Sequence, residues 1–244
     1  ELSVYSTSPL VPEETLIIFD EIQVCERALT SLKYFAEEAP QYCLAAAGSL
    51  LGLAINRDKY SFPVGKVQIK TMFPMNMEEF LWAQGKDQAA SMIRECTEKD
   101  SYCNLHNHFL DEYKKFISIG GMPQVVKQYI ESQDYNFIVA LQKNIIDAHV
   151  ADMAKYAEKA ETVKILAVYN SLPAQLAKEN KKFQYKTIKS GARAVQYETA
   201  LDWLVDSATV NKCLKVNEGK SPLIAYADAG SFKVYMGDTG LLCS

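Results

Sequence analysis

Residues 16–23 read Leu-Ile-Ile-Phe-Asp-Glu-Ile-Gln, so that four apolar residues run directly into two adjacent carboxylates, Asp20 and Glu21. A short apolar run of this kind suits a strand that is buried on both faces of a parallel sheet. Open α/β sheets bind their ligands at the carboxyl ends of such strands. The pattern is typical of a Walker B element. On spacing alone, a core strand that ends in a solvated acidic turn explains it equally well.

The two carboxylates have distinct chemistry if the element is a Walker B. Asp20 would then hold Mg²⁺ through the water shell of the ion, and Glu21 would orient and deprotonate the water that attacks the γ-phosphate of ATP. We therefore take Glu21 as the candidate catalytic base and Asp20 as the candidate residue for ATP and Mg²⁺.

A strand, a helix and a second strand follow each other around this stretch. Apolar residues recur at helical spacing from 29 to 39 and stop at Pro40, and the small apolar run 42–47 predicts a strand that ends at Gly48-Ser49. In P-loop ATPases a small polar residue at this place, called sensor 1, touches the attacking water or the γ-phosphate. Ser49 is thus a second candidate catalytic and ATP-contacting residue, with an ordinary turn as the alternative. Alternating apolar positions in 67–73 predict a third strand.

The composition is that of an ordinary globular protein. Of 244 residues, 48% are hydrophobic and 23% charged, and no apolar run approaches the length of a membrane span. No signal peptide opens the chain, so we expect a cytoplasmic protein without a membrane partner. The six cysteines lie far apart with no Cys-x-x-Cys, which argues against a zinc site and a disulfide framework and predicts reduced, mostly buried thiols.

The net charge of −4 conceals a basic segment between residues 178 and 193. It carries five lysines and one arginine against Glu179 alone, a net +5, which leaves −9 for the rest of the chain. Such a segment indicates either a surface for a polyanion or a solvated lysine-rich face.

The last third of the sequence predicts three helices and a hairpin. The helices are expected from Val163, from Pro173 and over 194–207, and the strands over 210–216, 223–226 and 232–236. Three helices followed by a hairpin form a winged helix, whose third helix commonly enters a groove of DNA. The basic segment lies just before that helix, where phosphate contacts are made. The predicted contacts are Lys181, Lys182, Lys186, Lys189 and Arg193.

Several short motifs, taken in order, resemble one family. They are Asp20-Glu21 with its strand, Ala47-Gly48-Ser49-Leu50-Leu51, Phe73-Pro74-Met75, Glu79-Phe80-Leu81, Gly120-Gly121-Met122-Pro123, Gln175-Leu176-Ala177-Lys178-Glu179-Asn180, Phe232-Lys233-Val234-Tyr235 and Asp238-Thr239-Gly240-Leu241-Leu242. The sequence is similar to prokaryotic AAA+-type ATPases whose C-terminal part is a nuclease-like domain of unknown function.

This resemblance implies an α/β fold in three parts. A P-loop NTPase core with a parallel sheet is expected over 1–119 and a helical lid over 120–160. A winged-helix-like α+β domain is expected over 161–244, leading into a further C-terminal domain. The implied cofactors are ATP and Mg²⁺.

Two features of the family are not found in the sequence. No Gly-x-x-x-x-Gly-Lys-Ser/Thr is present, because Leu214 stands where Gly219-Lys220-Ser221 would need its first glycine. We expect the Walker A loop upstream of Glu1, in a larger protein of which this chain is a fragment. The family also usually places an arginine after sensor 1, where Gly65-Lys66 stand, so no arginine finger is assigned.

The sequence therefore predicts an ATP-binding and ATP-hydrolysing AAA+-type protein whose nucleotide state is coupled to a winged-helix, DNA-binding domain. The alternative is a non-enzymatic DNA-binding or protein-interaction adaptor that keeps the fold without turnover. The partners considered are ATP, duplex DNA and further copies of the same chain. His149, on an apolar helix face, is expected in the core.

Overall fold

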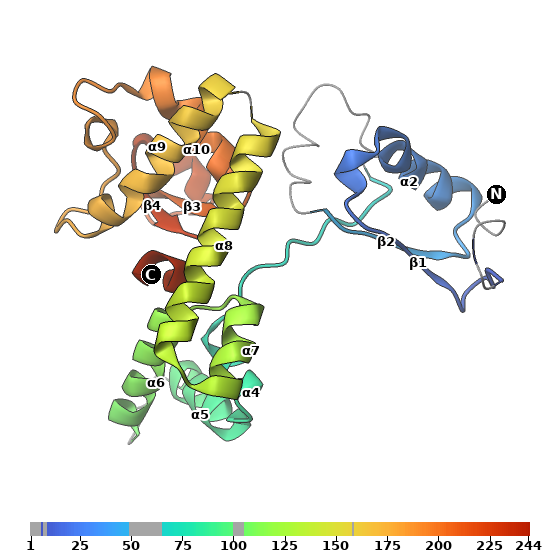
Figure 1. Cartoon of the computed structure of the whole chain (residues 1–244), viewed down its shortest axis with the longest axis horizontal. Coiled ribbons are helices and arrows are strands. Elements are labelled where there is room, and N and C mark those ends of the chain that lie inside the picture. Colours follow the sequence, from blue (N-terminus) through green and yellow to red (C-terminus); the bar gives the residue numbers. More distant parts are fainter. Residues whose placement is uncertain (1–5, 7–8, 49–64, 100–104, 158) are drawn as a thin grey trace. The chain divides into compact units, whose positions relative to one another are not determined.

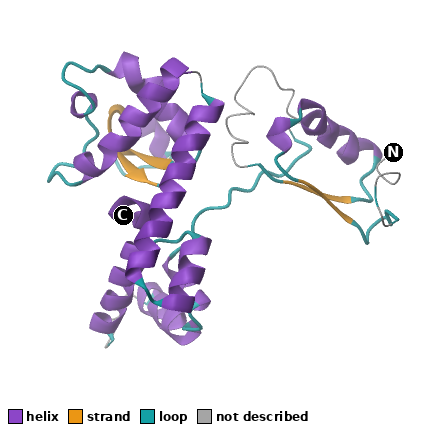
Figure 2. Ribbon diagram, in the orientation of Figure 1, coloured by secondary structure: helices purple, strands orange, loops and turns teal. Residues whose placement is uncertain are grey.

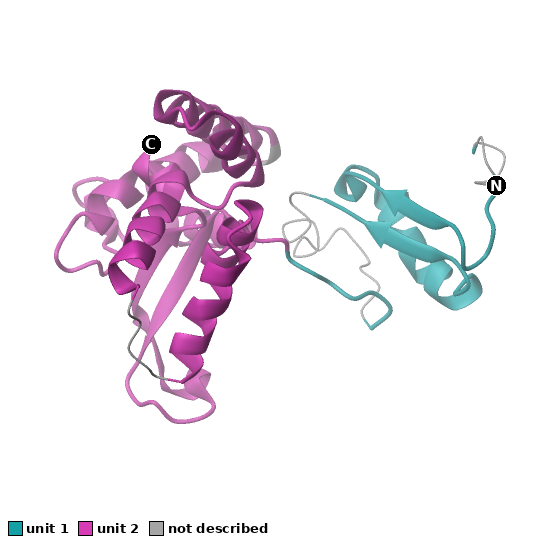
Figure 3. Ribbon diagram, turned by 90° about the horizontal axis from the view of Figure 1, so that it is seen from below, with its two compact units in different colours: residues 1–71 teal, residues 72–244 magenta. Residues whose placement is uncertain are grey.

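The computed structural model describes residue 6 and residues 9–48, 65–99, 105–157 and 159–244. The chain divides into two compact units, residues 1–71 and 72–244, which are shown in two colours in Figure 3. The hydrophobic clusters of the described residues each lie within one unit. No helix in these ranges combines the length and apolar character needed to cross a bilayer.

The first unit is a βαβ arrangement (Figure 1). Strand β1 (Leu16–Phe19) leads through a 3-10 helix, η1 (Ile22–Val24), into helix α2 (Glu26–Glu38), and strand β2 (Cys43–Ala46) follows. The two strands are parallel, with Leu16 opposite Cys43 and Phe19 opposite Ala46. The predicted strand, helix and second strand are therefore confirmed.

The strands of this unit are covered on one face only among the described residues. Ile22, Leu29 and Leu32 form the core, with Phe19 and Leu44 packed against it. On the other face, Leu16 and Ile18 are 59% and 64% exposed. The expectation of a strand buried on both faces is wrong for this part of the chain, because α2 covers a single face of a two-stranded sheet.

Two further expectations are also wrong. Residues 67–73 form no strand: Val67 packs against the core of the first unit, whereas Ile69 and Phe73 are exposed, so the alternating pattern has no partner strand and no core to face. The thiols of Cys25, Cys43, Cys213 and Cys243 are exposed rather than buried, and that of Cys96 is half-buried.

The second unit begins with a group of five helices. Asn76 and Glu79 form the predicted capping box, in which each side chain accepts the backbone N–H of the other residue at 3.0 and 2.8 Å. Buried residues of α4, α6, α7 and α8, among them Phe80, Ile119 and Val125, make one cluster. The helices are α4 (Met77–Ala83), α5 (Asp87–Glu98), α6 (His106–Ile119), α7 (Pro123–Ser132) and α8 (Tyr135–Tyr156).

Helix α8 runs past this group to a second, larger cluster (Figure 1). That cluster is built by helices α9 (Lys159–Leu176) and α10 (Ala194–Asp206) and the antiparallel strands β3 (Val210–Val216) and β4 (Ala227–Met236), drawn in orange in Figure 2. The short elements are η2 (Tyr185–Thr187), η3 (Leu223–Tyr226) and α11 (Thr239–Cys243).

Pro173 does not begin a helix of its own, as the sequence had predicted, but lies inside α9. It falls in the last turn, where few backbone bonds depend on it, and its neighbours Leu172 and Gln175 are fully buried in the cluster. The two predicted helices are therefore one. The predicted divisions at 119/120 and 160/161 fall within the second unit.

Candidate functional site

The Asp20-Glu21 pair lies where β1 ends, at the carboxyl edge of the parallel pair. Two hydrogen bonds fix this edge: Ala47 N–H donates to the Phe19 carbonyl at 2.8 Å, and Ile22 N–H donates to the Ala47 carbonyl at 3.0 Å. The carboxylates and the end of β2 are thus held next to each other by backbone contacts. This is the position at which open α/β sheets bind ligands.

Glu21 has the left-handed backbone conformation, with φ 49° and ψ 42°. A residue with a Cβ in this region costs of order 1–3 kcal/mol, and such residues cluster at functional sites. The turn is held by the Glu21 N–H, which donates to Asp20 Oδ1 at 3.0 Å. Gln23 Nε2 in turn donates to Glu21 Oε2 at 2.5 Å, which orients the exposed carboxylate.

Gln23 is the one residue of this site whose role the sequence did not indicate. It belongs to the stretch 16–23, but its contact with Glu21 depends on the left-handed turn between them. Ser49 lies outside the described residues, so its assignment as sensor 1 stays a prediction.

The site suits a magnesium ion that is held through water. Asp20 is exposed, and of its two oxygens only Oδ1 takes part in a hydrogen bond of the described residues. Mg²⁺ typically keeps several waters and takes one or two carboxylates together with substrate phosphates. The described residues contain no group of three or more His, Cys, Asp or Glu that could hold a metal ion. Asp20 would hold such an ion, which would neutralise charge on the phosphates.

The predicted DNA-contacting residues lie together, between α9 and the start of α10. All five side chains are exposed, and none forms an ion pair with another described residue. They are Lys181, Lys182, Lys186, Lys189 and Arg193. Their positive charges therefore face solvent. A surface that binds a polyanion requires this arrangement, and a solvated lysine-rich face without a ligand is compatible with it too.

Buried contacts hold this basic segment in place. The Gln184 N–H donates to Oε1 of Gln175, which is 3% exposed, at 2.7 Å, and the Phe183 N–H donates to the Phe232 carbonyl of β4 at 2.9 Å. The rings of Phe183 and Phe232 are stacked with centroids 5.6 Å apart. The segment is thus fixed to both α9 and the hairpin.

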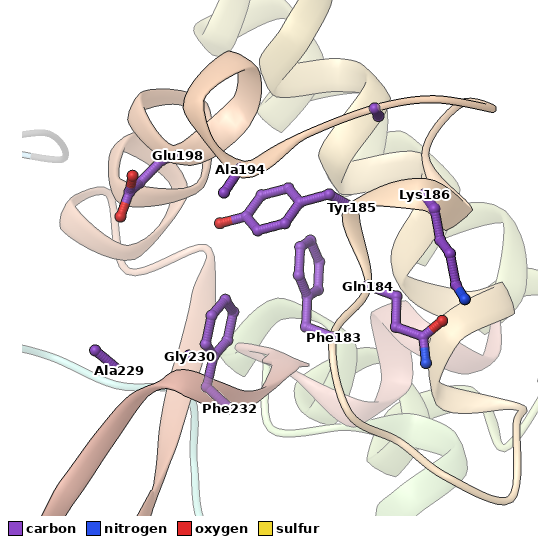
Figure 4. Close-up of a pocket in the computed structure, with 10 residues that line it drawn as sticks. Phe183, Gln184, Tyr185, Lys186, Ala194, Glu198, Ala229, Gly230 and Phe232 are labelled. Atoms are coloured by element: carbon purple, nitrogen blue, oxygen red, sulfur yellow. The ribbon is translucent and has the colours of Figure 1, made fainter.

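A pocket of about 500 Å³ opens beside the segment, between the start of α10 and β4 (Figure 4). Phe183, Tyr185 and Phe232 line it, and Glu198 of α10 stands at its side. Burial, with the negative charges of Glu198 and Asp202, raises the pKa of the Tyr185 hydroxyl. The sequence did not predict this pocket, because its walls come from three separate segments.

Comparisons with known proteins agree with this geometry. Residues 2–81 match the family model described as AAA domain, and residues 110–244 match the one described as Domain of unknown function (DUF8612). The fold resembles the Walker-type ATPase PABY2304 of Pyrococcus abyssi, with a TM-score of 0.53 and 12% identity over 93% of this chain. The match spans 61% of that structure's chain. No curated protein matches the sequence.

The AAA match covers the βαβ unit and its carboxylate pair, and the structural likeness extends along most of the chain. The N-terminal part therefore has the fold of a P-loop NTPase and matches the AAA domain model. The second match has no functional description, so the nuclease-like character stays a prediction. Because this second match covers more than half of the sequence, the chain belongs to the DUF8612 family, with an AAA-type P-loop NTPase part at its N-terminal end.

Proposed function

We propose that this chain is part of an ATP-hydrolysing AAA+-type protein in which the nucleotide state controls a DNA-binding, winged-helix-like portion. The observation that carries the proposal is the carboxylate pair after β1, with Glu21 in a strained turn and its carboxylate oriented by Gln23. The pair stands at the carboxyl edge of a parallel strand pair, where open α/β sheets bind their ligands.

The two carboxylates divide the work in the proposed reaction. Asp20 would hold a water of the Mg²⁺ shell through its exposed oxygen. Glu21 would accept a proton from the water that attacks the γ-phosphate, and the hydrogen bond from Gln23 orients its carboxylate. Ser49 would contact the same water or phosphate from the end of β2.

The DNA-binding part of the proposal is supported by the order of elements after residue 158. Helices α9 and α10, with the short 3-10 helix η2 between them, precede the β3–β4 hairpin, so two α-helices stand where the sequence predicted three. The exposed basic residues lie before and at the start of α10. In a winged helix the corresponding helix and hairpin face the duplex. The lysines and Arg193 would contact phosphates and set affinity rather than sequence preference.

The test is the change Glu21→Gln in the natural full-length protein. The carboxamide keeps the shape of the side chain but cannot accept a proton, so the rate of ATP hydrolysis should fall at least about 100-fold. The dissociation constant for ATP, measured by calorimetry with Mg²⁺, should stay within about threefold of the wild-type value. The proton acceptor that the variant lacks acts only in the transition state and not in the binding of ATP. Asp20→Asn should weaken the Mg²⁺-dependent binding as well.

Glu14→Gln is the matched control, since Glu14 is an exposed carboxylate of the same unit that lies before β1. It should hydrolyse ATP at the wild-type rate. If Glu21→Gln also does so, Glu21 is not the base. If the wild-type protein binds no ATP, the adaptor function without turnover takes the place of this proposal.

A further inference from the structure

The pocket beside the basic segment has an aromatic interior and side chains of opposite charge at its two ends. The rings of Phe183 and Phe232 are stacked at an interplanar angle of 19°, and the ring of Tyr185 stands edge-on to Phe183 with centroids 5.1 Å apart. Figure 4 shows these three rings between Glu198 of α10 on one side and Lys186 on the other. A flat apolar ligand with a donor at one end and a negative charge at the other suits this arrangement.

The aromatic interior is fixed in place and still accessible. Phe183 and Phe232 are 6% and 9% exposed, and both belong to the larger hydrophobic cluster, so they form a firm floor. Tyr185 is half-buried, which leaves part of its ring open to the pocket. The volume of about 500 Å³ lies within the usual range for small-ligand sites. Four further lining residues are small and do not close the pocket: Ala192, Ala194, Ala229 and Gly230.

The polar groups at the α10 end of the pocket are not used within the described structure. The Tyr185 hydroxyl and the Glu198 carboxylate form no hydrogen bond or ion pair with another described residue. Burial and the negative charge of Glu198 raise the pKa of the Tyr185 hydroxyl, so it stays protonated and neutral. A carboxylate offers two acceptor oxygens and no donor. A ligand at this end therefore needs N–H or O–H groups.

Positive charge surrounds the rest of the pocket. Lys186 is a lining residue, and Lys182 and Arg193 directly adjoin the lining residues Phe183 and Ala194 in the sequence. All three side chains are exposed and form no ion pair with another described residue. These cations could bind phosphates on either side of a ring that enters the pocket. Proteins that bind single-stranded nucleic acid combine aromatic stacking platforms with such cations.

A ligand that joins a flat ring with N–H donors to phosphates is a nucleotide. In a duplex each base is stacked between its neighbours and its edge is paired, so it must leave the stack before it can enter a pocket. Unpaired bases, in contrast, stack on aromatic side chains and form hydrogen bonds through their edges. The pocket therefore fits an unpaired base and not a base pair.

We propose that the pocket binds one unpaired nucleobase of a DNA strand whose flanking phosphates contact Lys182, Lys186 and Arg193. This inference rests on the proposed function and specifies the form of DNA that the basic segment binds. Tyr185 stacks on the base, and Glu198 accepts hydrogen bonds from its edge. Guanine fits best, because its N1–H and N2–H₂ are adjacent donors for the two carboxylate oxygens. Thymine has one N–H between two carbonyl oxygens, which repel a carboxylate.

The first test is Tyr185→Leu in the full-length protein, which keeps an apolar side chain but removes the aromatic face. The probe is a labelled thymine strand of about 15 nucleotides with one central guanine, used alone and as a blunt duplex. At one salt concentration, fluorescence anisotropy should show that the variant binds the single strand about tenfold more weakly than the wild type. Its affinity for the duplex should stay within about twofold, because the lysines that meet phosphates are kept.

Tyr235→Leu is the matched control, since Tyr235 is a partly exposed tyrosine of β4 that does not line the pocket. It should bind both forms of DNA as the wild type does. If Tyr185→Leu binds the single strand with wild-type affinity, or loses affinity for both forms equally, the pocket does not receive a base.

The second test, Glu198→Gln, separates a base contact from simple charge repulsion. Glu198 is exposed, so this variant should fold even if Tyr185→Leu does not. The wild type should bind the strand with the central guanine about fivefold or more tightly than an all-thymine strand, and the variant should lose this preference. Glu179→Gln removes the same charge from an exposed position in the basic segment, outside the pocket, and should keep the preference.

The possible outcomes separate this inference from the proposed function. If the wild type binds duplex DNA but shows no preference for guanine, and Tyr185→Leu binds the single strand normally, this inference fails and the proposed function stands. If the wild type binds neither form of DNA, the DNA-binding part of the proposed function fails too. Guanosine monophosphate that competes with the strand at equal concentration would assign the pocket to a free nucleotide and overturn the proposal.

Discussion

His149 is half-buried on α8, in surroundings that disfavour the charged form of its imidazole. Its Nδ1 is buried and has no hydrogen-bond partner among the described residues. Burial lowers the pKa of the imidazole, and the negative charges of Asp152 and Asp238 only partly oppose this. The neutral form is therefore the one that the folded state favours.

The free energy of unfolding should depend on pH through His149. In the unfolded chain the imidazole has its ordinary pKa of about 6.5, so as the pH falls below that value the unfolded chain takes up a proton that the folded state resists. The stabilisation is present above this pKa and is lost below it. In the variant His149→Leu, the free energy of unfolding should therefore fall less between pH 7.5 and pH 5 than it does in the wild type. Urea unfolding at several pH values in this range would measure the difference.

The difference in this pH dependence between wild type and variant measures how far the pKa of His149 is lowered by folding, because one pKa unit corresponds to about 1.4 kcal/mol. His108→Gln is the control, because it also removes one imidazole, but from an exposed position on α6. An unaltered pH dependence in His149→Leu would mean that the imidazole is protonated equally well in both states.

At the residue scale the position of the candidate carboxylates could be predicted from the sequence, but the local geometry around them could not. Asp20 and Glu21 follow from a strand pattern and two adjacent carboxylates, and they lie at the expected edge. The left-handed turn at Glu21 and its contact from Gln23 could not be predicted, because glutamate has no marked preference for that conformation. The buried contact of Asp238 with Gly121 could not be predicted for another reason, since the two residues lie 117 positions apart in the sequence.

At the scale of elements, periodicity predicted most helices and the strands β1, β2 and β3, but it was wrong at 67–73 and at 223–226, which forms the 3-10 helix η3 rather than a strand. The helices around α6, α7 and α10 occur where apolar residues recur at helical spacing. The alternation in 67–73 was misleading, because a strand also needs a partner and Ile69 and Phe73 have no core to face. Pro173 was misleading because it lies on the exposed side of the last turn of α9, whose other side, with Leu172 and Gln175, is buried in the cluster.

The basic segment between α9 and α10 is predicted to contact DNA. Changing Lys181, Lys182 and Lys186 together to alanine should lower the affinity for duplex DNA, because each lysine releases counterions when it meets a phosphate. The slope of log affinity against log salt is about −0.9 per phosphate, so it should become shallower by up to about three units. Preference between DNA sequences should hardly change.

The control removes the same charge elsewhere, by changing Lys114, Lys127 and Lys143 of α6, α7 and α8 to alanine. These side chains are exposed, so the variant should fold and keep the wild-type slope. If the first variant folds and its affinity and slope match those of the wild type, the basic segment is a solvated face or binds an acidic protein.

At the scale of the whole molecule, the cores define the units more sharply than the pattern of strands and helices does. The sequence placed divisions at 119/120 and 160/161, where helical segments change their pattern. These divisions stay a prediction, and the two compact units meet between Thr71 and Met72. Helix α4 contributes Phe80 to the same cluster as Ile119 and Val125, so the helices on both sides of Gly120 share one core. A sequence pattern shows that a helix is amphipathic but not which helix covers its apolar face.

Residues 72–244 should therefore fold when they are produced alone. Both large clusters lie wholly in this range, and the described core of the first unit draws on none of it. The melting temperature of this fragment should stay within about 3 °C of the corresponding transition in the whole chain. A fragment 120–244 is the control. It lacks Phe80 and Ile119, and with Ile119 the close contact that Gly240 makes with its carbonyl, so that apolar surface of α7 and α8 becomes exposed. It should melt much lower or fail to give a cooperative transition, and calorimetry with near-ultraviolet circular dichroism would show either result. Equal stability of the two fragments would mean that the cluster around Phe80 is not part of the core on which the second unit depends.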